Sequence, residues 1–224
     1  MFAGDVATGR GRLAAWSDSI LVDHGFFRLA WGNFAPVVPG RLYRSNHPTP
    51  ARLAAASRRV GIKTVINLRG RRACGSDALS REAAARLGLR HIDAPFESRG
   101  APHRERVLAL ADIFRRMEEP ALIHCKSGAD RAGLAAAIFL LVNGRPLAEA
   151  TAQLSWRFGH FRHARTGILD AFLICYAREG EGRKPFLEWV REDYAEAALR
   201  RDFVAGGLSH FLIDPIIDRV LRRE

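Results

Sequence analysis

Short apolar runs alternate with longer segments of helical periodicity along most of the chain. The runs at 64–68, 89–94 and 121–124 are bounded by glycine, proline or charged residues, which is typical of buried strands. A further short strand is expected at 41–44. Strands that alternate with helices indicate βαβ units. We therefore predict an α/β fold with a small, mostly parallel central sheet flanked by helices, and with extra helices towards both termini.

Capping residues and apolar residues at helical spacing predict the helices between these strands. Thr49 reads as an N-cap and Pro50 as a first-turn proline, so a helix is expected through Ser57 and to end near Gly61. Further helices are expected over 80–87, 102–117, 132–142, 146–158, 167–176 and 186–201.

The N-terminal segment, residues 11–34, mixes apolar, aromatic and charged side chains. Its first part fits an amphipathic helix that is interrupted near His24 and Gly25. Such a helix most often packs on a core. Its aromatic residues and the basic charge of the chain keep an interfacial helix at a membrane as the alternative.

Composition places the 224-residue chain among ordinary globular proteins, with 48% hydrophobic and 26% charged residues. The longest apolar run, 132–142, is too short to span a bilayer, and no secretory pattern is found at the N-terminus, so a cytoplasmic location is expected. The net charge of +11 favours anionic partners, although a solvated basic surface explains it equally well. We find no basic and aromatic pattern of a nucleic-acid module, so no specific nucleic-acid partner is expected.

Three widely spaced cysteines, Cys74, Cys125 and Cys175, form neither a C-x-x-C pair nor a metal-finger pattern. A disulfide framework is therefore not expected. His160 and His163 could suggest a metal, but a lone pair of histidines without a neighbouring carboxylate or cysteine is more often structural.

The segment 124–131 reads His-Cys-Lys-Ser-Gly-Ala-Asp-Arg and stands between the strand 121–124 and the apolar helix 132–142. In such a setting successive backbone amides and the positive end of the helix bind an oxyanion. Gly128 supplies the conformational freedom that a tight loop needs. Arg131 can hold a phosphate with a bidentate fork that lysine cannot match. The same positive field favours the thiolate of Cys125, the form that acts as a nucleophile.

His124-Cys125-x5-Arg131 with Gly128 resembles the signature of the protein tyrosine and dual-specificity phosphatase superfamily. The resemblance is strong from the strand 121–124 to the next helix. It extends weakly over 39–176, where 41–45 and 64–69 look like early segments of compact bacterial and fungal dual-specificity-like members. It implies a cysteinyl-phosphate intermediate, no metal and no cofactor.

The resemblance also divides the chain. It implies a phosphatase catalytic domain at 35–182, preceded by an N-terminal helical extension at 1–34. A C-terminal helical extension at 183–224 is expected to pack on the same domain.

Carried over to this chain, the signature makes Cys125 the nucleophile and Arg131 the phosphate clamp. His124 would orient the loop and help to hold the thiolate. Arg69, at the end of a predicted strand, is expected at the same edge of the sheet, where it could contact substrate or pair with Asp130. The implied substrate-binding set is His124, Lys126, Ser127, Gly128, Ala129 and Arg69.

The acid that protonates the leaving oxygen has three candidates. Asp130 resembles the loop aspartate of lipid-directed members such as the myotubularins and is ranked slightly first, with an ion pair that stiffens the loop as the alternative. Asp93 lies about thirty residues before the cysteine, where many members carry their acid, and Glu97 follows it. Ala132 departs from the pattern, because the family often has Ser or Thr there to assist the second step.

The expected substrate is a phosphorylated protein, with tyrosine or dual specificity. A phosphoinositide, inositol phosphate or lipid phosphate is the alternative, because Lys126, Arg69 and the net charge favour a more anionic ligand. An anionic membrane surface is then a further candidate partner. A catalytically impaired phosphate-binding module is a second alternative, and sulfur or arsenate chemistry on the cysteine loop is a third.

Overall fold

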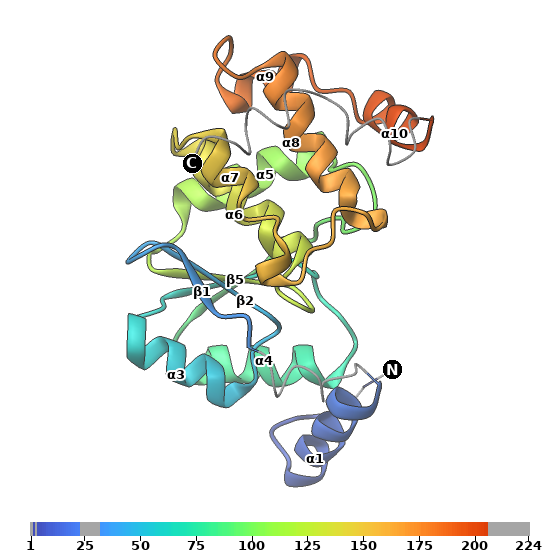
Figure 1. The fold of residues 1–224 in the computed structure, drawn as a ribbon. Coiled ribbons are helices and arrows are strands. Elements are labelled where there is room, and N and C mark those ends of the chain that lie inside the picture. The colour runs from blue at the N-terminus through green and yellow to red at the C-terminus, as the bar shows by residue number, and fades with distance from the viewer. Residues whose placement is uncertain (1, 3, 23–31, 206–224) are drawn as a thin grey trace. The chain divides into compact units, whose positions relative to one another are not determined.

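A computed structural model describes the chain apart from residues 1, 3, 23–31 and 206–224 (Figure 1). The chain divides into two compact units, each considered by itself. The first unit comprises Met1–Pro95 and Met117–Gly128, and the second comprises Phe96–Arg116 and Ala129–Glu224.

A five-stranded sheet forms the centre of the first unit, in the order β1-β2-β5-β3-β4. Only β1 pairs antiparallel, with β2, while the pairs β2–β5, β3–β5 and β3–β4 are parallel. Crossover connections between parallel strands bring their carboxyl ends to one edge. The strands are β1 (Ala35–Val38), β2 (Leu42–Ser45), β3 (Thr64–Asn67), β4 (Arg90–Asp93) and β5 (Ala121–His124).

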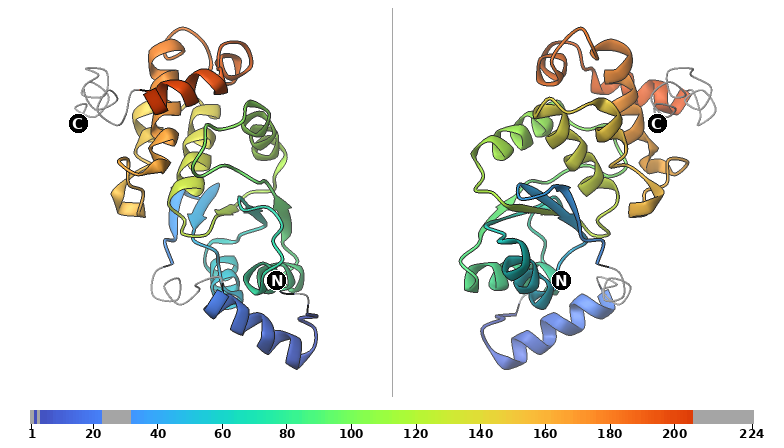
Figure 2. Two further views of the ribbon diagram at one scale, coloured as in Figure 1. Left: turned by 90° about the vertical axis from the view of Figure 1, so that its right-hand side faces the viewer. Right: turned by 60° about the vertical axis from the view of Figure 1, so that its left-hand side comes forward.

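Two helices, α3 (Pro50–Val60) and α4 (Gly75–Arg86), lie on one face of this sheet (Figure 2). Their buried residues Leu53 and Ala83 share a core cluster with Val65 of β3. The side chain of Thr49 accepts from the amide of Arg52, which caps α3 as its sequence predicts.

Helix α1 (Gly9–Ser17), followed by a short π-helical turn at Asp18–Val22, packs along α4. A Cβ added at Gly75 would lie 2.0 Å from the carbonyl oxygen of Ala15, so the two backbones approach too closely for any side chain there. Leu13 remains exposed. The described part of the N-terminal segment therefore packs against α4, and Ala15 is the residue that α1 buries. The predicted break near His24 and Gly25 lies outside the described residues.

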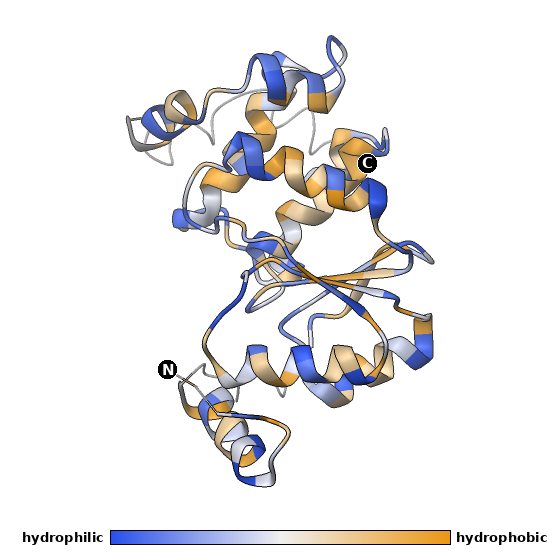
Figure 3. Cartoon of the chain, turned by 180° about the vertical axis from the view of Figure 1, so that it is seen from behind, coloured by the Kyte–Doolittle hydropathy of each residue, from blue (hydrophilic) through white to orange (hydrophobic). Residues whose placement is uncertain are grey.

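The second unit is helical where the structure describes it, and α6 is buried along almost its whole length. A helix that is hydrophobic all round is expected to be enclosed by others, and α6 packs against α5, α7 and α9. Helix α5, by contrast, is banded in polar and apolar residues (Figure 3). The α-helices are α5 (Arg104–Arg116), α6 (Asp130–Val142), α7 (Leu147–Thr151), α8 (Ile168–Glu179), α9 (Phe186–Glu192) and α10 (Glu196–Ala205).

Hydrogen bonds join the C-terminal part of this unit to the start of α5. The hydroxyl of Tyr194 donates to the carbonyl of Pro102 at 2.8 Å. The carboxylate of Glu196 accepts from the backbone amide of Arg104 at 2.6 Å and from His103 at 2.7 Å. Glu196 therefore satisfies an amide that would otherwise be unpaired at the helix N-terminus.

The predicted fold class is confirmed: the protein is α/β, with a mostly parallel sheet and flanking helices. Two helix predictions are wrong. The stretch 146–158 is not one helix, because α7 ends at Thr151 and a separate 3₁₀ turn covers Trp156–Phe158. The stretch 186–201 is two helices, α9 and α10, separated by residues 193–195. Strand β1 was not predicted, because Pro36 within it and Pro39 directly after it favour a turn.

Among the described residues, none of the helices combines the length and the hydrophobicity that crossing a bilayer requires. The predicted division at 34 and 182 stays a prediction.

Candidate active site

Cys125 follows β5 directly, at the carboxyl edge of the sheet. Strand β5 lies between β2 and β3, with His124 opposite Ser45 on one side and Asn67 on the other. The amide of Leu68 donates to the carbonyl of His124 at 2.9 Å. Two parallel neighbours thus fix the point at which the loop begins.

Three successive carbonyls of the loop are bound by groups of the first unit. The oxygen of Lys126 accepts from the amide of His47 at 3.3 Å, and that of Ser127 from Asn33 Nδ2 at 3.0 Å. The oxygen of Gly128 accepts from Arg44 Nη2 at 2.7 Å. In a trans peptide the carbonyl and the following N–H point in opposite directions. The amides of Ser127 and Gly128 therefore point away from these partners.

The side chain of Cys125 lies on that amide side. It is 2% exposed, and its Sγ accepts from the amide of Gly128 at 3.2 Å. An N–H directed at sulfur stabilises the anionic form of the thiol more than the neutral form. The loop therefore places a backbone donor directly against the sulfur of Cys125.

Gly128 cannot be replaced without disturbing this geometry. Its φ of 78° lies in the left-handed region, which is unfavourable for other residues. A Cβ there would lie 2.7 Å from the amide nitrogen of Asn46 and 2.9 Å from Asn33 Nδ2. Both the backbone angle and the space at this position demand glycine.

Arg131 belongs to the first turn of α6 in the second unit, which begins after Gly128. The amide of Gly133 donates to the carbonyl of Ala129 at 2.8 Å, so Ala129 closes the first helical turn. Arg131 Nε is buried and has no hydrogen-bond partner among the described residues. A buried guanidinium donor without a partner is costly, and a phosphate oxygen would satisfy it.

His124 is fully buried and packs edge-on against His47, with ring centroids 4.7 Å apart. Burial, aided by the field of His47, holds the pKa of His124 well below its ordinary value, and an interaction with the Cys125 backbone only partly opposes this. His124 is therefore a neutral ring beneath the loop at neutral pH.

Arg69 follows β3 and so reaches the same edge of the sheet as Cys125, as its sequence position predicts. Its Nη1 lies 3.4 Å from Nδ1 of His47. The predicted contacts of Arg69 with substrate or Asp130 stay predictions.

Asp93 is held in an ion pair at the end of β4. Both its oxygens lie within 2.8 Å of Arg81 Nη2, and Oδ1 also accepts from Asn67 at 3.1 Å. Arg81 also bonds to the buried Asp77. Burial opposes the charge on Arg81, but the hydrogen bonds that Arg81 donates to Asp93 and Asp77 outweigh burial and raise the pKa of Arg81.

The other two acid candidates are also paired, both within the second unit. Glu97 accepts from Arg106 and lies 3.5 Å from Nε2 of His103. Asp130 Oδ1 is 2.8 Å from Nδ1 of His160, whose Nε2 is 2.7 Å from Asp170. His160, for which the sequence favours a structural role over a metal ligand, bridges two carboxylates. Among the described residues, no cluster of three or more metal-ligating side chains is found.

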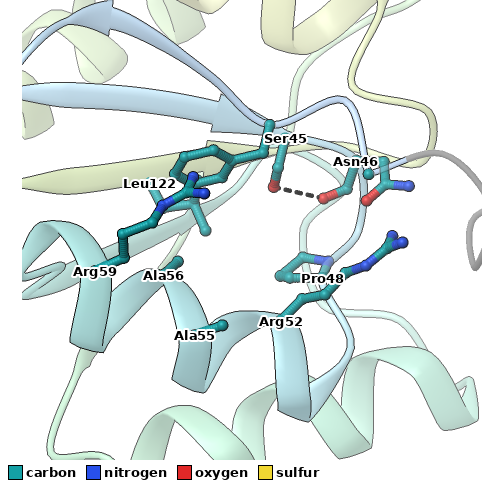
Figure 4. A pocket seen from close by; sticks show the side chains of 10 residues that line it. Ser45, Asn46, Pro48, Arg52, Ala55, Ala56, Arg59 and Leu122 are labelled. Atoms are coloured by element: carbon teal, nitrogen blue, oxygen red, sulfur yellow. Dashed lines mark hydrogen bonds between the residues drawn. The ribbon is translucent and has the colours of Figure 1, made fainter.

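A separate pocket of about 210 Å³ lies between α3 and the sheet. Figure 4 shows Leu122 and Ala56 on its apolar floor, with Arg52 and Arg59 of α3 at its border. The guanidinium of Arg59 lies over the ring of Phe34, 4.7 Å from its centroid. Cys125 does not line this pocket.

Sequence reasoning missed the residues that hold the loop from outside: Arg44, Asn33 and His47. An arginine inside a strand whose four residues are all buried is an unusual feature, and it was the available signal for Arg44. Asn33 and His47 left no comparable signal, because their roles depend on where the chain folds back towards β5.

A family model identifies the class of protein to which this fold belongs. The model of the PTP-SAK family, described as the Swiss Army Knife protein DSP-PTPase phosphatase domain, matches residues 32–166. The chain belongs to this family and is a phosphatase. Among curated proteins, no sequence match was found.

Solved structures show the same fold. P. aeruginosa TpbA is similar with a TM-score of 0.53 at 21% identity, over 77% of this chain and 91% of TpbA. A putative phosphatase (DUF442) from Shewanella putrefaciens CN-32 has a TM-score of 0.52 at 19% identity, over 69% of this chain and 95% of its own. Tk-PTP in its active form has a TM-score of 0.50 at 24% identity, over 64% of this chain and 97% of Tk-PTP.

Proposed function

We propose that the protein is a cysteine-dependent phosphomonoester hydrolase with Cys125 as nucleophile. The observation that carries this proposal is the hydrogen bond from the Gly128 amide to Cys125 Sγ. It occurs in a loop whose carbonyls accept hydrogen bonds from the first unit, so that the amides of Ser127 and Gly128 point to the opposite side, where Cys125 lies. Arg131, with its buried and unpartnered Nε, is the phosphate clamp.

The reaction has two steps. The Cys125 thiolate attacks phosphorus, a sulfur–phosphorus bond forms, and the bond from phosphorus to the leaving oxygen breaks while an acid protonates that oxygen. Water then attacks the cysteinyl phosphate and gives a proton to the now ionised acid, while the sulfur–phosphorus bond breaks; this releases inorganic phosphate and returns the thiolate and the protonated acid. Loop amides and Arg131 stabilise the charge on the transferred phosphoryl group throughout.

Asp130 is the acid that we propose. Asp93 is less suited, because Arg81 and Asn67 bind both of its oxygens in the first unit. Asp130 is bound through Oδ1, and its side chain keeps 24% of its surface exposed. It also stands directly before Arg131 in the chain, so its backbone position is tied to that of the clamp.

The proposed substrate is a phosphorylated protein, with tyrosine or dual specificity. A TpbA variant was solved in complex with pTyr, and its fold is similar to this one with a TM-score of 0.53 at 23% identity. A phosphoinositide or lipid phosphate, at an anionic membrane surface, is the second candidate. Lys126 in the loop and Arg69 at the same sheet edge favour it. A cytoplasmic location stays a prediction.

The test is hydrolysis of p-nitrophenyl phosphate by the wild type, Cys125→Ser and Arg131→Lys from about pH 5 to 8, the range in which such acids and thiolates titrate. We expect turnover by the wild type, none by Cys125→Ser, and a loss of at least about 100-fold for Arg131→Lys. A Cys125→Ser variant as active as the wild type would exclude the mechanism. No turnover by any variant would favour a phosphate-binding module.

The residue after Arg131 allows a second test. Ala132 is fully buried and lacks the hydroxyl that related phosphatases often have at this position to assist the second step. We expect the second step to be slow, so that the wild type shows a burst of p-nitrophenol equal to the enzyme concentration. Ala132→Ser should shorten the slow phase and leave the burst unchanged. A linear time course without a burst would show that Ala132 does not limit turnover.

A further inference from the structure

His160 lies between two carboxylates in the interior of the second unit. It is 2% exposed. Its Nδ1 lies 2.8 Å from Asp130 Oδ1 on α6, and its Nε2 lies 2.7 Å from Asp170 Oδ2 on α8. Arg162 Nε donates to the second oxygen of Asp170 at 3.3 Å. His160 and Asp170 are buried, while Asp130 and Arg162 are partly exposed.

The charge of His160 follows from these contacts. A histidine can donate from both ring nitrogens to carboxylates only when it is protonated. Burial, the largest influence, disfavours the charge, but the hydrogen bonds that His160 donates to Asp130 and Asp170 outweigh it and raise the pKa of His160 to about 9. While both carboxylates are ionised, the ring is therefore a cation that donates to both of them. Asp130 must then take up a proton at Oδ2 before it can act as the acid. In the proposed function, that proton comes from a bound phosphate monoester monoanion and passes through Oδ2 to the leaving oxygen.

The contact with Asp130 limits how that carboxylate can turn. Asp130 is the first residue of α6, and Ala129 before it offers no side-chain cap. A free aspartate in a first turn would rotate among solvent and the unpaired helix amides. Here Oδ1 is bound by His160, while the exposed part of the side chain leaves room for Oδ2 to act.

We propose that His160, itself held by Asp170, is a positioning residue that fixes the Asp130 carboxyl with Oδ2 as the proton-donating oxygen. The proposal rests on the proposed function, in which Asp130 is the acid. His160 touches neither substrate nor the reacting atoms in this role. It acts through the orientation of Asp130, and Asp170 acts through His160.

The experiment compares kcat/KM for phenyl phosphate and p-nitrophenyl phosphate. Phenolate is the poorer leaving group and depends more on protonation by the acid. The ratio of the two values does not depend on how much of a variant is folded. Four variants are compared with the wild type: Asp130→Asn, His160→Leu, His160→Asn and the exposed control His163→Leu.

We expect Asp130→Asn to lose about 100-fold more on phenyl phosphate than on p-nitrophenyl phosphate, the lower range of general acid catalysis. His160→Leu should also lose more activity on phenyl phosphate than on p-nitrophenyl phosphate, by about 10-fold. His160→Asn keeps a donor where Nδ1 lies and should recover most of the wild-type ratio. His163→Leu should leave the ratio unchanged.

Two outcomes would overturn the inference, and they differ. If Asp130→Asn lowers kcat/KM more for phenyl phosphate than for p-nitrophenyl phosphate, while His160→Leu lowers both values by the same factor, His160 is only structural and the proposed function stands. If Asp130→Asn itself shows no selectivity, Asp130 is not the acid, and both that part of the proposed function and the positioning role fail. The Cys125→Ser assay tests the nucleophile independently of either result.

Discussion

Arg44, in the middle of the sheet, donates a hydrogen bond of 2.7 Å from Nη2 to the carbonyl of Gly128 in the cysteine loop. Arg44 is completely buried, and it belongs to β2, the strand that pairs with β5 immediately before the loop. An arginine is seldom buried without a specific partner. This bond therefore ties the loop's backbone to the scaffold at the residue whose amide faces Cys125.

The first prediction concerns this bond. Arg44→Met should lower the free energy of unfolding by about 1–3 kcal/mol, because the buried Gly128 carbonyl loses a charged donor. It should also reduce kcat/KM for p-nitrophenyl phosphate by more than the loss of folded protein explains, since the Gly128 amide is no longer fixed. Urea unfolding and steady-state kinetics on the same preparations separate the two effects.

Arg41→Met is the matched control. Arg41 lies just before β2 and pairs with Glu119 at the surface, at 2.8 Å and with 44% of its side chain exposed. Exposed pairs contribute at most about 1 kcal/mol. A kinetic loss in Arg41→Met as large as that in Arg44→Met would mean that Gly128 is not held in the way described.

Gly128→Ala is the second prediction. The left-handed backbone alone should cost about 1–2 kcal/mol, and the added Cβ would collide with the Asn46 amide. Because the loop must shift, we expect vanadate, a phosphate mimic, to bind far more weakly than to the wild type. Gly144→Ala is the comparison, since Gly144 also has positive φ, 69°, but meets nothing within 4 Å. It should lose stability but retain vanadate affinity.

Four of the five strands, and the position of the loop after β5, could be predicted from the sequence for a physical reason. The strand 121–124 is short, apolar and bounded, and the Cys-x5-Arg spacing with Gly128 depends on local backbone geometry alone. Helix α3 was equally clear, since Thr49 and Pro50 mark its start and Gly61, with φ of 71°, its end.

The remaining parts depended on contacts between distant positions. Asp93 has the sequence position of an acid, but Arg81, twelve residues before it, binds both of its oxygens. His160 was predicted to be structural rather than a metal ligand, but its two carboxylate partners could not be identified from the sequence, because they lie 30 and 10 residues away. The break between α9 and α10 was hidden for a similar reason, since Tyr194 bonds to Pro102 rather than continuing a helix.

The third prediction concerns Asp93. Asp93→Asn should lower the free energy of unfolding, because Arg81 loses its ionic partner. In the wild type, Arg81 Nη2 donates to Oδ1 and Oδ2 of Asp93 at 2.7 Å and 2.8 Å. The pH–rate profile should keep its shape, since Asp93 is expected to hold Arg81 rather than to donate a proton. The measurement is kcat/KM from about pH 5 to 8, beside the same profile for Asp130→Asn. A changed profile in Asp93→Asn and an unchanged one in Asp130→Asn would move the acid role to Asp93.

Stability at alkaline pH is the fourth prediction. The pKa of His160 rises from 6.5 to about 9 on folding, so its contribution is fully present below about pH 6.5 and is lost as the pH rises through about 9. The wild type should lose about 2–3 kcal/mol over that interval from this group. His160→Asn, which has no titrating ring, should show a flatter curve in urea unfolding between pH 6 and 10. An equally steep curve would mean that the ring is not charged in the folded protein.

The fifth prediction concerns acid pH and His124, whose shift has the opposite sign. Burial, together with the field of His47, holds its pKa well below 6.5 in the folded state, so the unfolded chain binds the proton first. The stability associated with a neutral His124 is therefore present above about pH 6.5 and is lost as the pH falls below it. His124→Asn should unfold less steeply on acidification than the wild type, measured by urea unfolding from pH 7 to 4. His163→Asn, at an exposed position, should follow the wild type, and the same flattening in that control would assign the acid sensitivity to groups other than the buried ring beneath the loop.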